Sequence, residues 1–83
     1  MTVAELKAVL DWAKFDTDYD TTYEEVVAEF GVEGLFVDEY EAFDKPFCRY
    51  RWIADEENYI TITFEIQADG TKTWNVTAWE GLK

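Results

Sequence analysis

The stretch YITITFEIQADG, residues 59–70, has the most regular pattern in this 83-residue chain. From Ile60 to Ile66 apolar residues alternate with polar ones, and this period of two is typical of a β-strand that buries one face. The following Asp69-Gly70 supplies the positive φ values of a tight hairpin turn. We therefore expect a strand over residues 59–67 and an antiparallel strand over residues 72–80.

Two further strands and two helices are expected before this hairpin. Residues 35–43 and 47–53 also have strand-like alternation. Thr2 and Thr22 are each followed three positions later by a glutamate, and this capping-box pattern predicts helices over residues 3–14 and 22–30. Gly31 is placed to end the second helix. The order predicts an α+β fold in one domain, residues 1–83, with two N-terminal helices packed on one face of a four-stranded antiparallel β-meander.

The same alternation predicts which side chains of the sheet meet the helices, because successive residues of a strand point to opposite faces. A slip of one residue would exchange the two faces. The expected helix-facing residues are Cys48, Tyr50, Trp52, Ile60, Ile62, Phe64, Ile66, Trp74, Val76 and Ala78. The expected residues of the opposite face are Phe47, Arg49, Arg51, Tyr59, Thr61, Thr63, Glu65, Thr73, Asn75, Thr77 and Trp79.

Aromatic residues and arginines of that opposite face are candidate partner contacts, since such side chains often carry the binding energy of an interface. For the aromatic residues, the alternative is packing against the ends of the chain. For the arginines, the alternative is an ion pair within the sheet, with Glu65 or Asp55. The candidate partner-binding residues of the sheet face are Phe47, Arg49, Arg51, Tyr59 and Trp79.

Negative charge is concentrated in residues 11–44, which hold twelve carboxylates against one base, Lys14, so that 1 − 12 = −11 of the net charge of −12 lies there. Such a field repels nucleic acid and anionic membranes and steers the chain toward a basic surface of another protein. These carboxylates either keep the chain soluble or bind a partner. If they bind a partner, they can mimic the phosphates of a nucleic acid. The candidate acidic contacts are Asp16, Asp18, Asp20, Glu24, Glu39 and Glu41.

Catalysis and metal binding have little support in the sequence. There is no histidine and no serine, and Cys48 is expected on the core side of its strand, where thiols are usually inert. The run Asp16-Thr17-Asp18-Tyr19-Asp20 resembles the start of a calcium loop, but Thr21 and Val27 stand where the pattern needs glycine and glutamate. We expect a solvated loop with Asx turns there, and we expect no catalytic residues, no metal and no cofactor.

Several segments resemble the β-lactamase-inhibitor-protein-like domain, which also occurs in small bacterial lipoproteins and in an outer-membrane assembly lipoprotein. The segments are TTYEEVVAEFG (21–31), Gly34, YRW (50–52), ITITF (60–64) and WEGLK (79–83). The resemblance implies a helix-helix-four-strand unit that binds proteins through its exposed sheet face without catalysis. Family members usually follow a signal peptide or a lipid-attachment cysteine, whereas this chain starts with Met1 beside its first helix.

The function expected from these features is that of a non-enzymatic, acidic protein-binding domain, a stoichiometric inhibitor or adaptor that occludes a partner's functional surface. The alternative is a nucleic-acid-mimicking decoy, as in phage or mobile-element anti-defence proteins of the anti-CRISPR type, which fills a basic site of a nuclease or DNA-binding protein. The partner is a protein with a basic surface, without direct nucleic-acid or membrane binding, and the chain is a monomer or a weak homodimer. With no signal segment at its start we expect a cytoplasmic protein, or a secreted one or a lipoprotein if a leader was removed.

Overall fold

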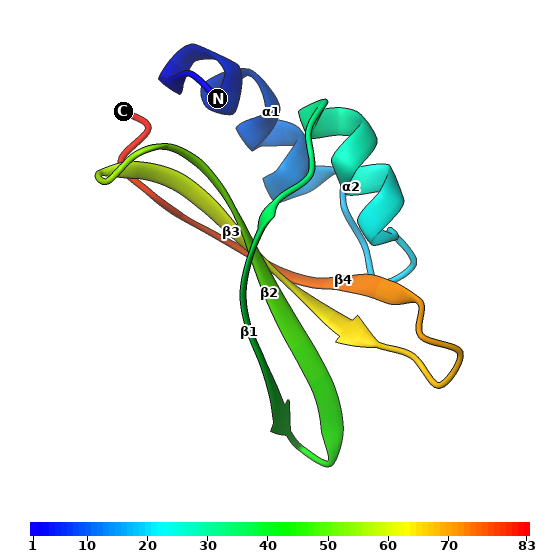
Figure 1. Ribbon diagram of the computed structural model, residues 1–83. Coiled ribbons are helices and arrows are strands. Elements are labelled where there is room, and N and C mark those ends of the chain that lie inside the picture. The colour runs from blue at the N-terminus through cyan, green and yellow to red at the C-terminus, as the bar shows by residue number, and fades with distance from the viewer.

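A computed structural model describes all residues from 1 to 83 and has the expected α+β architecture. The four strands form one antiparallel sheet in the order β1-β2-β3-β4, and both helices lie on the same side of it (Figure 1). Neither helix is long and apolar enough to cross a membrane. The elements are α1 (Val3–Phe15), α2 (Tyr23–Phe30), β1 (Leu35–Ala42), β2 (Lys45–Asp55), β3 (Asn58–Ile66) and β4 (Lys72–Glu80).

Both helices begin at the predicted capping boxes. The hydroxyls of Thr2 and Thr22 accept hydrogen bonds from the backbone amides of Glu5 and Glu25, whose carboxylates accept hydrogen bonds from the two threonine amides. Gly31 ends α2 with a φ of 81°, a left-handed conformation that glycine adopts without steric cost. The residue patterns that predicted these helices therefore also define their ends.

The hydrophobic core lies between the helices and the concealed face of the sheet. Trp52 lies at the centre of this core and is 2 % exposed. Its ring stacks on Phe30 with centroids 4.4 Å apart, and its indole nitrogen donates a hydrogen bond to the carbonyl of Val32 at 2.9 Å. This indole therefore attaches α2 and the segment after it to the sheet. The buried core residues are Leu6, Leu10, Ala13, Val26, Phe30, Cys48, Trp52, Ile60, Ile62, Phe64 and Leu82.

The predicted faces are confirmed for the buried positions of β2 and β3, but the prediction for β4 is wrong beyond Trp74. Phe64 pairs with Trp74, whereas its neighbour Thr63 pairs with Val76, so Asn75 is an extra residue in a β-bulge. The bulge exchanges the two faces of the rest of the strand. Val76, which is 48 % exposed, and Ala78 consequently lie on the sheet face opposite the helices, although the alternation predicts that both face the helices.

Thr77 and Trp79 instead lie on the helix side of β4. The Thr77 hydroxyl donates a hydrogen bond to the carbonyl of Ala13 in α1 at 2.7 Å, and Lys14 Nζ lies 4.6 Å from the centre of a Trp79 ring. These contacts connect the end of α1 to the edge of the sheet. The expectation that Trp79 belongs to the uncovered face with Phe47, Arg49, Arg51 and Tyr59 is therefore corrected.

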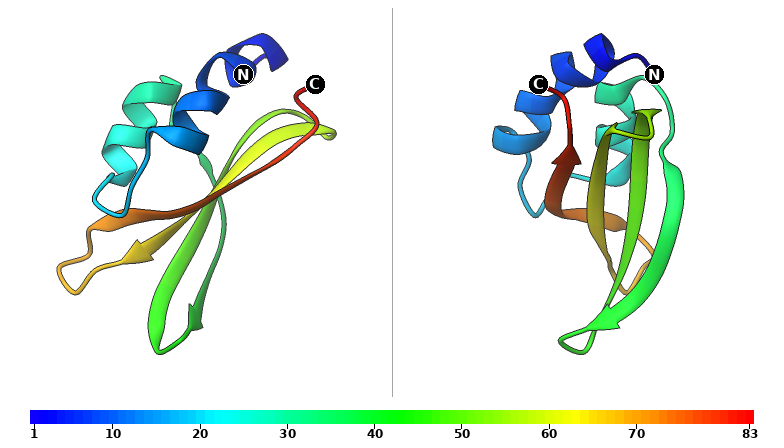
Figure 2. Two further views of the ribbon diagram at one scale, coloured as in Figure 1. Left: turned by 180° about the vertical axis from the view of Figure 1, so that it is seen from behind. Right: turned by 90° about the vertical axis from the view of Figure 1, so that its left-hand side faces the viewer.

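The two ends of the chain lie close together beside the β2–β3 turn (Figures 1 and 2). The Met1 ammonium group donates a hydrogen bond to the carbonyl of Ile53, and the Leu82 amide donates one to the Asn58 side chain at 2.9 Å. The buried Leu82 side chain adds to the core. The last residues of the chain thus contribute to packing.

Candidate functional site

The face of the sheet opposite the helices, called the open face below, has no helix over it (Figure 2). Residues that pair directly across antiparallel strands share a face, so the register identifies its members. The residues of the open face that pair across β1, β2 and β3 are Leu35, Asp38, Tyr40, Ala42, Lys45, Phe47, Arg49, Arg51, Ile53, Tyr59, Thr61, Thr63 and Glu65. Four of the five predicted sheet-face contacts are among them, and Trp79 is not.

Arg49 is held by β1. Its Nε donates a hydrogen bond to Asp38 Oδ1 at 2.7 Å and its Nη2 donates one to Asp38 Oδ2, while the guanidinium lies 5.3 Å from the centre of the Tyr40 ring. The hydrogen bond lowers the pKa of Asp38 and raises the pKa of Arg49. The expected partners of this arginine, Glu65 and Asp55, are not the ones it has, because a register shift in β1 brings Asp38 directly opposite it.

Arg51 has a similar environment on the other side of β2. Its Nε donates a hydrogen bond to the Thr61 hydroxyl at 2.9 Å, and its guanidinium lies 4.5 Å from the centre of the Tyr59 ring. The pairing expected for Arg51 is also wrong, since Glu65 pairs with Lys45 at 3.6 Å and Asp55 accepts hydrogen bonds within the β2–β3 turn. Both arginines are therefore fixed against tyrosines with part of their surface left to solvent.

Phe47 lies on the open face beside Tyr40 but is itself buried. Only 7 % of this residue is exposed, and its ring stacks with that of Tyr40 at a centroid distance of 5.7 Å. Tyr40 is 38 % exposed, so it is Tyr40 that presents aromatic surface at this point. Sequence analysis missed Tyr40, although its spacing of two from Asp38 places both on one face.

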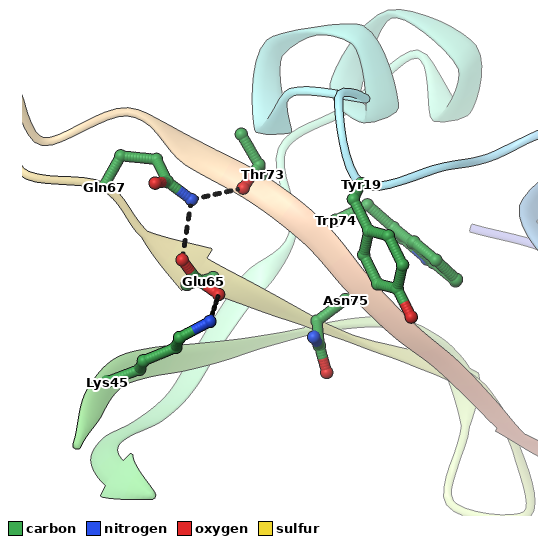
Figure 3. A pocket seen from close by; sticks show the side chains of 7 residues that line it. All are labelled: Tyr19, Lys45, Glu65, Gln67, Thr73, Trp74 and Asn75. Carbon is green, nitrogen blue, oxygen red and sulfur yellow. Dashed lines mark hydrogen bonds and ion pairs between the residues drawn. The ribbon is translucent and has the colours of Figure 1, made fainter. Parts of the chain in front are cut away.

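A polar hollow of about 400 Å³ lies where β3 and β4 approach their hairpin (Figure 3). The Gln67 amide nitrogen donates hydrogen bonds to Glu65 at 3.0 Å and to the Thr73 hydroxyl at 2.8 Å on one wall, and Tyr19 projects from the α1–α2 loop on the other. The hollow can hold a polar side chain of a partner, and its lining is Tyr19, Lys45, Glu65, Gln67, Thr73, Trp74 and Asn75.

The predicted acidic contacts are not gathered on one surface. Asp16, Asp18 and Asp20 lie in the α1–α2 loop, and Glu24 lies in α2 directly after it. A β-bridge between Thr22 and Thr73 attaches this part of the chain to β4. Glu39 and Glu41 lie on β1, which is the opposite edge of the sheet. The six carboxylates therefore form two separate groups and no continuous row.

The loop between the helices contains the expected Asx turn. Asp18 Oδ1 accepts a hydrogen bond from the amide of Asp20 at 2.8 Å, and the Thr21 hydroxyl donates a hydrogen bond to the same oxygen at 3.5 Å. No group of three or more potential ligand side chains is close enough to hold a metal ion.

Cys48 lies on the core side of β2, as predicted, and is 1 % exposed. Burial raises the pKa of its thiol, so the reactive thiolate is disfavoured.

Phe43 was predicted to end the first strand, but it lies in the two-residue turn between β1 and β2 and is 93 % exposed. The usual signal for such a turn is an asparagine or aspartate followed by glycine, and Phe43-Asp44 lacks it.

No protein-family model matches the chain, and no curated protein or solved structure is significantly similar to it. The resemblance to the β-lactamase-inhibitor-protein-like domain stays an expectation from the sequence.

Proposed function

We propose that this chain is a non-enzymatic protein-binding domain that acts stoichiometrically, as an inhibitor or adaptor, by covering a functional surface of a partner protein with its open face. One observation carries the proposal: two arginine–tyrosine stacks, Arg49 with Tyr40 and Arg51 with Tyr59, lie on a face that no helix covers. Arginine and tyrosine are enriched among the residues that dominate the energy of protein interfaces.

The stacks favour binding because they are ordered before a partner arrives. Each guanidinium already donates a hydrogen bond to the neighbouring strand, and the Tyr40 ring stacks with that of Phe47. A side chain that is already fixed loses less conformational freedom on association. The open face therefore suits a contact in which its own side chains keep their positions.

Charge divides the work between two parts of the molecule. The open face of the four strands has three bases, Lys45, Arg49 and Arg51, against three acids, Asp38, Glu65 and Glu80, so 3 − 3 = 0. The large negative charge lies elsewhere, and long-range attraction raises the rate of encounter with a basic protein. In this proposal the carboxylates steer the partner and the open face holds it.

The test uses a partner isolated by affinity capture with mass spectrometry, purified, and titrated with variants of this chain. Tyr59→Ala or Arg51→Ala should weaken binding by more than about 2 kcal/mol, and moderate salt should have a small effect. Phe15→Ala is the control, because this aromatic residue is 74 % exposed at the end of α1, outside the open face. Far-UV circular dichroism of each variant shows whether the fold is retained.

The opposite pattern would favour the nucleic-acid-mimicking decoy. Affinity would then fall by orders of magnitude with salt, and charge reversals at Asp16, Glu24 and Glu41 would each weaken binding by similar steps. If affinity survives both the open-face substitutions and the charge reversals, the proposed function is wrong.

A further inference from the structure

The turn between β1 and β2 has an unfavourable sequence for its shape. Ala42 pairs with Lys45, and the two residues between them, Phe43 and Asp44, have φ values of 54° and 62°. Two positive φ values in a two-residue loop define a type I′ turn, for which Asn-Gly or Asp-Gly is preferred. A phenylalanine at the first position is sterically unfavourable, because its Cβ crowds the backbone in the left-handed region.

Phe43, whose backbone is strained, is also the most exposed large hydrophobic residue of the molecule. Phe43 is 93 % exposed, compared with 74 % for Phe15 and 42 % for Trp79. The β1–β2 hairpin extends beyond the helices and ends at this residue, far from the chain ends (Figures 1 and 2). The Phe43 ring buries almost no surface, so packing in the core does not compensate for the backbone strain. Backbone strain of this kind concentrates where a protein acts on a ligand.

The surroundings of Phe43 are negatively charged. Glu41 and Asp44 flank it, both are exposed, and neither forms an ion pair. Lys45, the adjacent base, lies within 3.6 Å of Glu65. The hairpin tip (residues 41–45) is therefore an apolar projection with free carboxylates around it. The surface complementary to it is an apolar pocket with a basic rim.

We propose that the β1–β2 hairpin is an insertion element, whose Phe43 ring enters an apolar pocket with a basic rim on the partner protein. The inference rests on the proposed function for the existence of a protein partner, but it depends on Phe43, which does not belong to the open face. A second copy of this chain is a less suitable occupant. Its apolar cleft beside Phe15 and Trp79 contains one base, Lys14, and both copies have a net charge of −12.

The first part of the test measures stability without any partner. Phe43→Asn should raise the melting temperature by about 4 to 8 °C, because asparagine adopts the left-handed conformation more readily. Asp44→Gly should also raise it while keeping the aromatic ring. If Phe43→Asn lowers the melting temperature, the ring supports the fold and the proposal is overturned.

The second part identifies what the ring contacts. The full chain is produced with p-benzoylphenylalanine at position 43 in the organism it comes from, and the cells are irradiated. The protein that becomes cross-linked is identified, purified and titrated with variants of this chain. We expect Phe43→Asn to weaken binding of that protein by more than tenfold, while Phe15→Ala changes its affinity less than threefold. Asp44→Gly keeps the ring but removes one carboxylate, so it should weaken binding less than Phe43→Asn does. The photoreactive residue at position 15 is the cross-linking control.

Three results would overturn the insertion element: no cross-link specific to position 43, a cross-link to a second copy of this chain, or an affinity unchanged by Phe43→Asn. If Tyr59→Ala weakens binding and Phe43→Asn does not, the insertion element fails and the proposed function stands. The reverse pattern retains the insertion element and removes the open face from the interface.

Discussion

We expect glycine at position 34 to be required for full stability, because the Trp52 indole occupies the space that a larger side chain at position 34 would need. A Cβ atom at this position would lie 2.8 Å from Cζ2 and 2.9 Å from Cη2 of Trp52. The indole cannot move easily, since it stacks on Phe30 and donates a hydrogen bond to the carbonyl of Val32. Gly34 does not have a positive φ, so a substitution there acts through this contact.

Gly34→Ala should destabilise the chain by about 1.3 kcal/mol, the difference between the midpoints of a steric cost and an entropic offset. Forcing a methyl group into a packed core costs about 1 to 3 kcal/mol. The reduced freedom of the unfolded chain offsets about 0.4 to 1 kcal/mol of that cost. The free energy of unfolding is measured by urea titration. Far-UV circular dichroism is the signal, because the Trp52→Phe variant used below lacks one tryptophan and its fluorescence is not comparable.

A double-mutant cycle with Trp52→Phe identifies the cause. The smaller ring lacks the atoms that the new methyl group would meet, so Gly34→Ala should cost at least about 0.5 kcal/mol less in the Trp52→Phe background than in the wild type. An equal cost in both backgrounds would refute the steric argument.

Three further predictions concern the sheet. Ile62→Ala should cost about 2 to 5 kcal/mol of unfolding free energy and Thr61→Ala far less, and similar costs in urea titrations would contradict the assigned faces. The hydrogen bond from Arg49 lowers the pKa of Asp38, so this carboxylate stabilises the fold at neutral pH and loses that effect as the pH falls through its folded-state pKa. The advantage of the wild type over Asp38→Asn, measured at pH 7 and at pH 3, should therefore shrink below about pH 4. The buried Cys48 should react slowly with dithionitrobenzoate at pH 8 until urea is added, and rapid labelling of the folded chain would show that its strand opens.

The elements of this fold follow from local signals in the sequence. A capping threonine and the glutamate three residues after it bond to each other's backbone, so Thr2 and Thr22 mark helix starts without help from the rest of the chain. Alternation over residues 60–66 identifies both the central strand and its buried face, because that face must exclude water. These signals are sufficient for the order of elements, the α+β class and the buried side of β2 and β3.

Features that depend on contacts between strands were not predictable in this way. The bulge at Asn75 exchanges the faces of β4 and moves Trp79 next to Lys14, yet no glycine or break in the pattern marks it. The register shift in β1 selects Asp38 as the partner of Arg49, and only the paired strand reveals that shift.

Sequence by itself determined that this chain is intensely acidic, lacks histidine and serine, and forms two capped helices followed by a meander. The tertiary structure decided that the acids divide between opposite edges of the sheet and that Phe43 stands at the tip of a hairpin. Helix caps and strand alternation are specified within a few consecutive residues. Faces, partners and exposure depend on register, which is a property of two strands together.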